Sequence, residues 1–226
     1  MLVQDRMSKH PLTISQEETI SRAHSYMGEQ KVRHLPVVDK SGKMVGVVTE
    51  DDLLKAEPSG VTLLSVWELH ALMDKIKVRD VMITKVITTT EDTPIEEAAH
   101  LMLEHKIGCL PVMREDRLVG IITESDIFRT FMELFSARQK GIRLSMEIPD
   151  KEGQLAAVAQ AIANQGGYIA ACGTFMAEDP TKWGLVLKVR NVERDSLLES
   201  LSKIEGQRLL DVREVYPSRA DMVEGP

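Results

Sequence analysis

The sequence predicts an α/β (α+β) protein that joins a tandem pair of α/β units to a C-terminal ferredoxin-like domain. A short motif occurs twice, as GVVTEDD at residues 46–52 and as GIITESD at residues 120–126. The segments around both copies align in register, which indicates an internal repeat. After residue 141 the pattern changes to strand–helix–strand–strand–helix–strand, the order of a ferredoxin-like fold.

The repeat begins with VQDRM at residues 3–7 and VRDVM at residues 78–82. Each copy then reads as an extended piece, a helix, a strand through LPV, a turn, a second strand and a second helix. The first helix carries Ile20, Ala23 and Met27 at i, i+3 and i+7, the stripe of an amphipathic helix. Such a unit buries one face of its sheet under its helices.

Changes in the pattern divide the chain into five parts. Proline, serine and glycine at 58–60 interrupt the chain between the copies, and the apolar residues after them predict a connecting helix. The polar C-terminal tail is expected to be disordered. The parts are the first copy (1–57), the connecting insert (58–77), the second copy (78–138), the C-terminal domain (141–216) and the tail (217–226).

Residues 125–140 predict a helix that Gly141 ends. Its apolar face is wide, which indicates burial in an interface. That face consists of Ile127, Phe128, Phe131, Met132, Leu134 and Phe135.

The composition is that of a globular protein, with 43% apolar and 28% charged residues. The formal net charge is −7 and acidic residues exceed basic ones in both 1–140 and 141–226, so no basic face is expected and nucleic acid is not an expected partner. No apolar run approaches membrane-spanning length, and the N-terminus lacks the apolar core of a signal peptide, so we expect a cytoplasmic protein. Cys109 and Cys172 lie in no metal-ligand spacing, and no metal site is predicted.

The tandem G-h-h-T-x-x-D unit, with its LPV strand and its leading V-x-D-x-M segment, resembles a pair of CBS domains over residues 1 to 138. CBS pairs usually bind adenosyl ligands and form dimers. The resemblance therefore implies AMP, ADP, ATP or S-adenosylmethionine as the ligand, and a homodimer.

Residues 142–216 resemble an ACT domain in their element order, in the loop DKEGQL and in the following QGGYI. One departure is Glu152, which precedes Gly153 where such domains often have proline. The CBS–CBS–ACT order is similar to that of the acetoin-utilisation B-type (AcuB-like) proteins of bacteria. The resemblance implies pairing of sheets and, in some members, an amino acid at the interface.

The repeated motif offers the groups that an adenine nucleotide needs. Asp52 or Asp126 can accept both ribose hydroxyls on one carboxylate, through charge-assisted hydrogen bonds. Thr49 or Thr123, where the strand ends, can donate to a phosphate, and the amides of the following helix suit an anion.

Further residues of both copies complete the candidate site. Gly46 and Gly120 would let the ligand approach the main chain. Apolar residues of both copies are expected to sandwich the base: Leu35, Leu110, Met7 and Met82. The remaining candidates lie at or within the LPV strands: Arg33, His34, Pro36, Cys109 and Pro111.

T-x-x-D is also a variant capping box, with threonine as the N-cap and an acidic residue at N3. One isolated copy would favour this interpretation. The repeat and the family resemblance favour a nucleoside site. Both roles are compatible, because the cap does not use both carboxylate oxygens.

The two copies differ before the LPV strand, where Arg33 and His34 align with Gly108 and Cys109. A pocket with the first pair would better hold phosphates, whereas the other would suit a neutral or shorter ligand. The alternative is that Arg33 and His34 are ordinary surface and strand residues. Lys85 is a possible phosphate neighbour, although a solvated loop position is favoured.

In the C-terminal domain, one strand-to-helix turn is a candidate amino-acid site. Its amides can take a carboxylate, and an acidic side chain can take an ammonium group. The alternative, a turn and helix cap in a domain that only dimerises, is favoured because the usual proline is missing. The turn contains Asp150, Glu152, Gly153, Gln154 and Leu155.

These patterns predict a regulatory sensor that binds an adenosyl ligand and changes the arrangement of its CBS-like pair relative to its ACT-like domain, thereby acting on a regulated protein. The alternative is a ligand-independent dimerisation or interaction module in acetoin or related metabolism. An enzyme is not predicted, because the sequence shows no nucleophile–base pairing, no phosphate-binding glycine-rich loop with lysine and no metal cluster.

Overall fold

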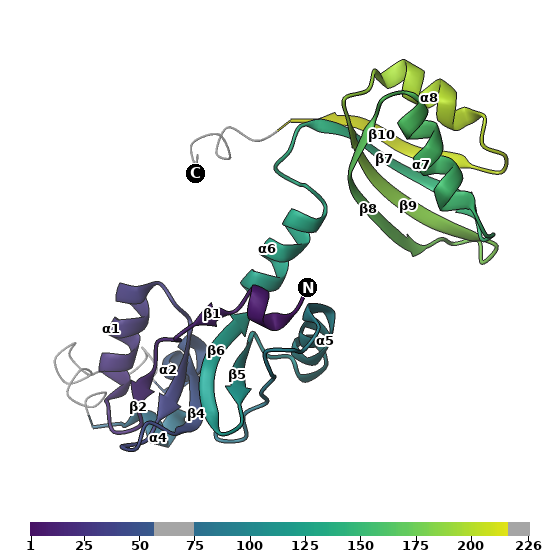
Figure 1. Ribbon diagram of the computed structural model, residues 1–226. Helices are drawn as coiled ribbons and strands as arrows, with labels where there is room; N and C mark the ends of the chain where they lie inside the picture. Colours follow the sequence, from purple (N-terminus) through teal and green to yellow (C-terminus); the bar gives the residue numbers. More distant parts are fainter. Residues whose placement is uncertain (57–74, 217–226) are drawn as a thin grey trace. The chain divides into compact units, whose positions relative to one another are not determined.

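The computed structural model describes residues 1–56 and 75–216 (Figure 1). The connecting helix expected within 58–77 and the tail 217–226 lie largely or wholly outside these residues. The chain forms two compact units, Met1–Ile127 and Phe128–Pro226. Each unit is an α/β structure of the predicted class.

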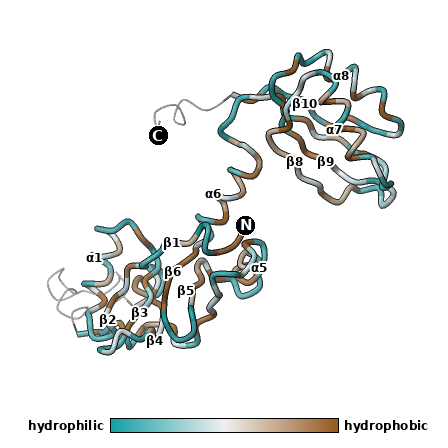
Figure 2. Tube along the Cα trace, viewed as in Figure 1, coloured by the Kyte–Doolittle hydropathy of each residue, from teal (hydrophilic) through white to brown (hydrophobic). Residues whose placement is uncertain are grey.

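The first unit contains two three-stranded sheets, one for each copy of the repeat. Apolar residues concentrate in the strands and hydrophilic residues in the turns (Figure 2). The first sheet has the order β2-β3-β4, formed by β2 (Ile14–Ser15), β3 (His34–Val38) and β4 (Met44–Thr49). The second has the order β1-β6-β5, formed by β1 (Ser8–Lys9), β6 (Arg117–Thr123) and β5 (Cys109–Arg114).

The helices of this unit follow the predicted amphipathic pattern. Thr19 caps α1 (Ile20–Gln30), and its hydroxyl accepts a hydrogen bond from the Arg22 amide at 3.1 Å. The predicted stripe of Ile20, Ala23 and Met27 is buried. The other helices are η1 (Val3–Asp5), α2 (Glu50–Ala56), α4 (Val78–Val81), α5 (Ile95–His105) and α6 (Glu124–Leu134), of which α6 continues into the second unit.

The leading segments of the two copies are exchanged. The β1 strand pairs with β6 of the second copy, and Val3 and Met7 join the apolar core around Leu110. Conversely, Val78 of α4 packs in the core around Leu35. The two copies therefore complete each other's cores.

A small apolar cluster contains residues of both copies. It consists of Val47 from β4, Cys109 from β5 and Ile121 from β6, with Val86 packed against it. Such a shared cluster stabilises the pair as one unit.

The second unit has the predicted ferredoxin-like topology. Its sheet order is β10-β7-β9-β8 with antiparallel pairing throughout. The predicted alternation in β7 is confirmed, since Ile142, Leu144, Met146 and Ile148 are all buried in the core with residues of both helices. The elements are β7 (Gly141–Pro149), α7 (Gln154–Asn164), β8 (Tyr168–Met176), β9 (Lys182–Arg190), α8 (Arg194–Ser202) and β10 (Arg208–Val215).

Helix α6 ends earlier than the predicted residue 140. Ser136 adopts a left-handed conformation (φ 48°), and the Ala137 amide donates to the Met132 carbonyl at 2.8 Å. This is the hydrogen-bond pattern of a Schellman stop, here made without glycine. Residues 135–140, which we call the connector, then lead into β7.

No helix in the described ranges is long and apolar enough to cross a membrane. Those residues also hold no group of three or more His, Cys, Asp or Glu side chains that is suited to a metal ion.

Candidate functional site

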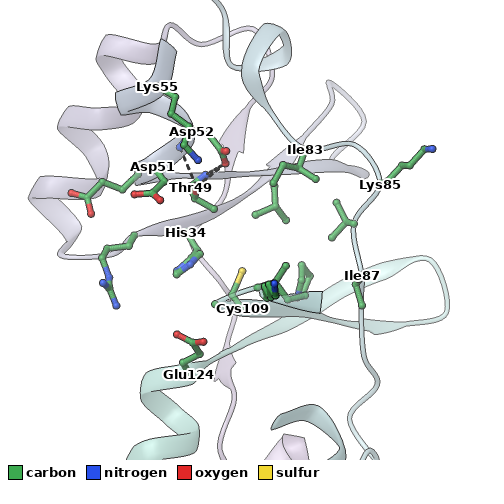
Figure 3. A pocket seen from close by; sticks show the side chains of 18 residues that line it. His34, Thr49, Asp51, Asp52, Lys55, Ile83, Lys85, Ile87, Cys109 and Glu124 are labelled. Carbon is green, nitrogen blue, oxygen red and sulfur yellow. Dashed lines mark hydrogen bonds between the residues drawn. The ribbon is translucent and has the colours of Figure 1, made fainter. Parts of the chain in front are cut away.

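A pocket of about 370 Å³ lies in the first unit and takes residues from both copies of the repeat. Among the predicted site residues, it brings together Arg33, His34, Thr49, Asp52, Cys109 and Pro111. The segment with Ile83, Lys85 and Ile87 faces the side formed by Thr49, Asp52 and His34 (Figure 3).

Thr49 and Asp52 form the capping box at the start of α2. The Thr49 amide and hydroxyl both donate to Oδ2 of Asp52, at 3.0 and 2.7 Å. The Asp52 amide donates back to the Thr49 hydroxyl oxygen at 3.2 Å. The expected role of Thr49 as a phosphate donor therefore needs correction, because its single hydroxyl proton is already directed to Asp52. The threonine instead holds the carboxylate in place.

The second copy repeats this geometry. The Thr123 amide and hydroxyl donate to Oδ2 of Asp126, at 2.9 and 2.7 Å. The same correction applies to Thr123 as a phosphate donor. Neither Thr123 nor Asp126 lines the 370 Å³ pocket, so the second Thr–Asp pair is not part of the site that holds the first.

The Arg33–His34 and Gly108–Cys109 pairs were predicted to line two different pockets, one for each copy of the repeat. Both pairs line the same pocket. A Cβ atom on Gly108 would lie 2.9 Å from Nε2 of His34, so the glycine makes room for the imidazole. Burial, and then the neighbouring Arg33, lower the pKa of His34 from its usual 6.5, although Glu124 opposes this shift.

Charged groups of both signs surround the pocket. The basic side chains come from four different segments: Arg33, Lys55, Lys85 and Lys106. The carboxylates come from the starts of α2 and α6: Glu50, Asp51, Asp52 and Glu124. A ligand that carries phosphates and hydroxyls can match both sets.

The apolar wall was not predicted. Ile83, Val86 and Ile87 follow α4 and face the pocket because Ile83 forms an antiparallel bridge with Val47 of the first copy. The repeat pattern predicts that the segment after α4 is extended, but the pattern does not show with which copy of the repeat this segment pairs. Lys85 lies on the same segment, and its side chain is exposed at the edge of the pocket.

Several predicted contacts lie in the cores, away from the pocket. Leu35 and Leu110 are fully buried, which leaves neither able to sandwich a base. A Cβ atom on Gly46 would meet the sulfur of Met82 at 2.8 Å, and one on Gly120 would meet that of Met7 at 2.4 Å. The glycines therefore admit the exchanged methionines where we expected a ligand. Pro36, Met7 and Met82 do not line the pocket either.

Cys109 is a structural residue of the pocket wall. Burial raises the pKa of its thiol to about 12, with Glu124 adding to the effect. A thiol with this pKa is not a nucleophile at neutral pH.

The turn at 150–155 has the geometry of a strand-to-helix connection. Gly153 is in the left-handed region (φ 81°) and precedes α7 without a side-chain cap, and the Asp150 amide donates to the Thr181 carbonyl at 2.8 Å. Oε1 of Gln154 is buried and has no hydrogen-bond partner among the residues that the structure describes, whereas Leu155 and Glu152 are exposed.

Comparisons with known proteins agree on the first unit. The family model of the CBS domain matches residues 3–59 and 78–133. The solved structure of a putative acetoin utilization protein (AcuB) from Vibrio cholerae aligns at 35% identity with a TM-score of 0.51, covering 60% of this chain and 93% of that chain. An uncharacterized protein of Methanocaldococcus jannaschii is 30% identical over 58% of this chain and 92% of its own length.

Other relatives are enzymes that match only in this region. The L-aspartate semialdehyde sulfurtransferase of Methanocaldococcus jannaschii is 34% identical over 58% of this chain and 23% of the enzyme. The inosine-5'-monophosphate dehydrogenase of that organism is 35% identical over 60% of this chain and 25% of the enzyme. The chain thus spans about a quarter of such relatives, and the matches lie in their CBS regions.

Proposed function

The chain belongs to the CBS-domain family, and we propose that it is a regulatory sensor whose CBS pair binds an adenosyl ligand. CBS pairs are ligand-sensing regulatory modules, and proteins of this family are typically non-catalytic. The observation that carries the proposal is the meeting of a ribose acceptor, four cations and an apolar wall in one pocket of about 370 Å³. Small-molecule sites typically have volumes of roughly 300–1,000 Å³.

Asp52 is the proposed ribose acceptor. An ionised carboxylate offers about four lone-pair sites, and the two Thr49 bonds use only Oδ2. Oδ1 and the remaining capacity of Oδ2 can accept the two ribose hydroxyls. Thr49 fixes the carboxylate before the ligand arrives, which lowers the entropic cost of binding.

The remaining groups fit the rest of the ligand. Arg33 and Lys85 are the proposed phosphate partners, because guanidinium and ammonium groups form charge-assisted hydrogen bonds with phosphate oxygens. Ile83 is 44% exposed, a large apolar side chain open to solvent beside the pocket. We assign it to one face of the adenine base.

Calorimetric titration of the full chain with AMP, ADP, ATP and S-adenosylmethionine tests the proposal. We expect at least one ligand to bind the wild type. Asp52→Ala is expected to weaken that binding about 10- to 100-fold, since a hydrogen bond to a charged group contributes roughly 1.5–3 kcal/mol. Failure of all four ligands to bind the wild type would refute the proposal.

Two further variants separate the ribose contact from helix capping. Thr49→Ala removes the cap but keeps the carboxylate, so it should weaken binding less than Asp52→Ala. Asp116→Ala removes an exposed carboxylate outside the pocket and should leave affinity unchanged. Equal losses for Thr49→Ala and Asp52→Ala would show that the carboxylate acts only through the cap.

We further propose that the C-terminal domain is an ACT domain, and that ligand binding changes the arrangement of the CBS pair relative to it. A ligand shifts such an equilibrium only through different affinities for the two arrangements. A regulated protein would respond to this change. An amino acid at the 150–155 turn is a weaker proposal, supported by the orphaned Oε1 of Gln154.

A second candidate function is ligand-independent dimerisation, favoured by the exposed apolar face of α6, where Phe128 is 68% exposed. It predicts a stable dimer whose melting temperature does not respond to any of the four ligands. The sensor instead gains stability with ligand concentration. Thermal melts with and without ligand therefore separate the two functions.

A further inference from the structure

A second pocket, of about 750 Å³, lies in the C-terminal unit. It is formed where β7 begins and where β9 and β10 end, and the connector supplies part of its wall. The 150–155 turn lies at the other end of β7, roughly 27 Å away along a strand of this length. The pocket is therefore separate from the turn that resembles an amino-acid site.

The pocket is basic within an acidic protein. It is lined by four cations and two carboxylates, whereas the chain as a whole has a formal charge of −7. The cations are Arg138, Lys140, Arg190 and Arg194, and the carboxylates are Glu193 and Glu214.

Both carboxylates are engaged by neutral donors. Glu193 caps α8 by accepting from the amides of Asp195 at 2.8 Å and Ser196 at 3.2 Å. Glu214 accepts from the hydroxyl of Tyr216. These bonds direct the carboxylates to the protein, and neither is paired with a pocket cation in the described part of the chain.

Three of the cations are open to an anion. Arg190 donates to the neutral amide oxygen of Gln139 at 2.7 Å, and Nζ of Lys140 lies 5.2 Å from the ring centroid of Tyr216. Within residues 1–56 and 75–216, Arg194 pairs with Asp195 alone, at 3.4 Å, in an exposed ion pair of little energetic weight. Among the described residues, Lys140 and Arg190 form no salt bridge.

We propose that this pocket binds a phosphorylated small molecule with at least two negative charges. Arginine guanidinium groups match phosphate oxygens in a planar fork, and lysine adds a mobile point charge. The volume lies in the range of metabolite sites. Because Gln139 and Lys140 belong to the connector, bound ligand would hold the connector against the strand ends, giving the protein an input separate from the CBS pair.

Pyrophosphate is the probe for the test. We would titrate it into the full-length chain and follow backbone amide shifts of Gly141, Asn191 and Tyr216 by NMR. Saturable shifts at these positions are expected, with an affinity at least about tenfold weaker in the Arg190→Gln/Arg194→Gln variant. Absence of saturation would overturn the proposal.

The matched control is Lys203→Gln/Arg213→Gln, which removes the same number of exposed charges outside the pocket. This control should bind pyrophosphate with the wild-type affinity. If it lost as much affinity as Arg190→Gln/Arg194→Gln, the loss would reflect net charge alone and not the pocket. A second titration uses a hexaglutamate peptide. If the peptide bound at these amides more tightly than pyrophosphate, the site would be one for acidic proteins, and the small-molecule assignment would be wrong.

Discussion

His34 lies against Gly108 in the CBS pocket, with Arg33, Glu124, Asp52 and Glu50 as its charged neighbours. Burial lowers the pKa of His34 below its usual 6.5. The unfolded chain therefore binds a proton at this residue at a higher pH than the folded chain does. By linkage, the folded state loses stability as pH falls from 6.5 to the lower folded pKa.

We expect acidification to destabilise the wild type more than a His34→Gln variant. Urea unfolding of both proteins between pH 7.5 and 5 measures the difference, because all other titrating groups are shared. The gap should open below pH 6.5, where the histidine begins to protonate in the unfolded chain. Parallel curves for the two proteins would contradict a lowered pKa at this site.

The exchanged leading segments make Gly46 of β4 sensitive to substitution. A Cβ atom there would lie 2.8 Å from the Met82 sulfur and 2.9 Å from the Ile83 carbonyl oxygen. Because the second contact is backbone, the bridge between Ile83 and Val47 would have to shift. Gly46→Ala should therefore destabilise the protein by about 1–3 kcal/mol, as overpacking does elsewhere.

Gly28→Ala in α1 is the matched control. A Cβ atom on Gly28 would meet no atom of the described residues within 4 Å, and alanine in a helix is favoured over glycine by roughly 0.5–1 kcal/mol. The free energy of unfolding, measured in urea, should therefore fall for Gly46→Ala and rise for Gly28→Ala. If Gly46→Ala left the free energy of unfolding unchanged, the segment with Met82 and Ile83 would have to move aside at little energetic cost.

Local patterns account for most of the elements but not for the exchange. The stripe from Ile20 to Met27 and the alternation from Ile142 to Ile148 each follow from the period of one element, and both are confirmed as buried. Pairing of β1 with β6 is set by tertiary contacts between segments far apart in sequence. An in-register repeat looks the same whether or not such segments are exchanged.

The same limit applies to the candidate site. Thr49 and Asp52 are predictable from the sequence because four consecutive residues encode a helix cap. Ile83 and Lys85 line the same pocket because Ile83 forms a bridge with Val47, a pairing for which the sequence carries no local signal. The prediction that Leu35 and Leu110 contact the ligand is wrong, because apolar strand residues that face the core and those that face a pocket have similar composition.

The apolar face of α6 is exposed in a single chain, and we expect the assembled protein to cover it. Phe128, Phe131 and Leu134 are each more than half exposed in a single chain. Contiguous exposed apolar side chains mark interaction sites, because burying them releases roughly 25 cal/mol per Å². We expect a homodimer in which a second copy covers this face.

Sedimentation velocity of Phe128→Ser tests this assembly. The variant should dimerise more weakly than the wild type, by about tenfold or more if the side chain is fully buried between subunits, since burying a Phe contributes roughly 1.5–3 kcal/mol. Leu103→Ser on α5 is the control, because Leu103 is 78% exposed outside that face and its substitution should leave the dimer unchanged. A monomeric wild type, or equal effects of both substitutions, would assign the α6 face to a different partner.

Addition of the CBS ligand to the wild-type dimer then shows whether assembly is coupled to sensing. A ligand that binds one arrangement more tightly must shift the monomer–dimer equilibrium by its difference in affinity for the two arrangements.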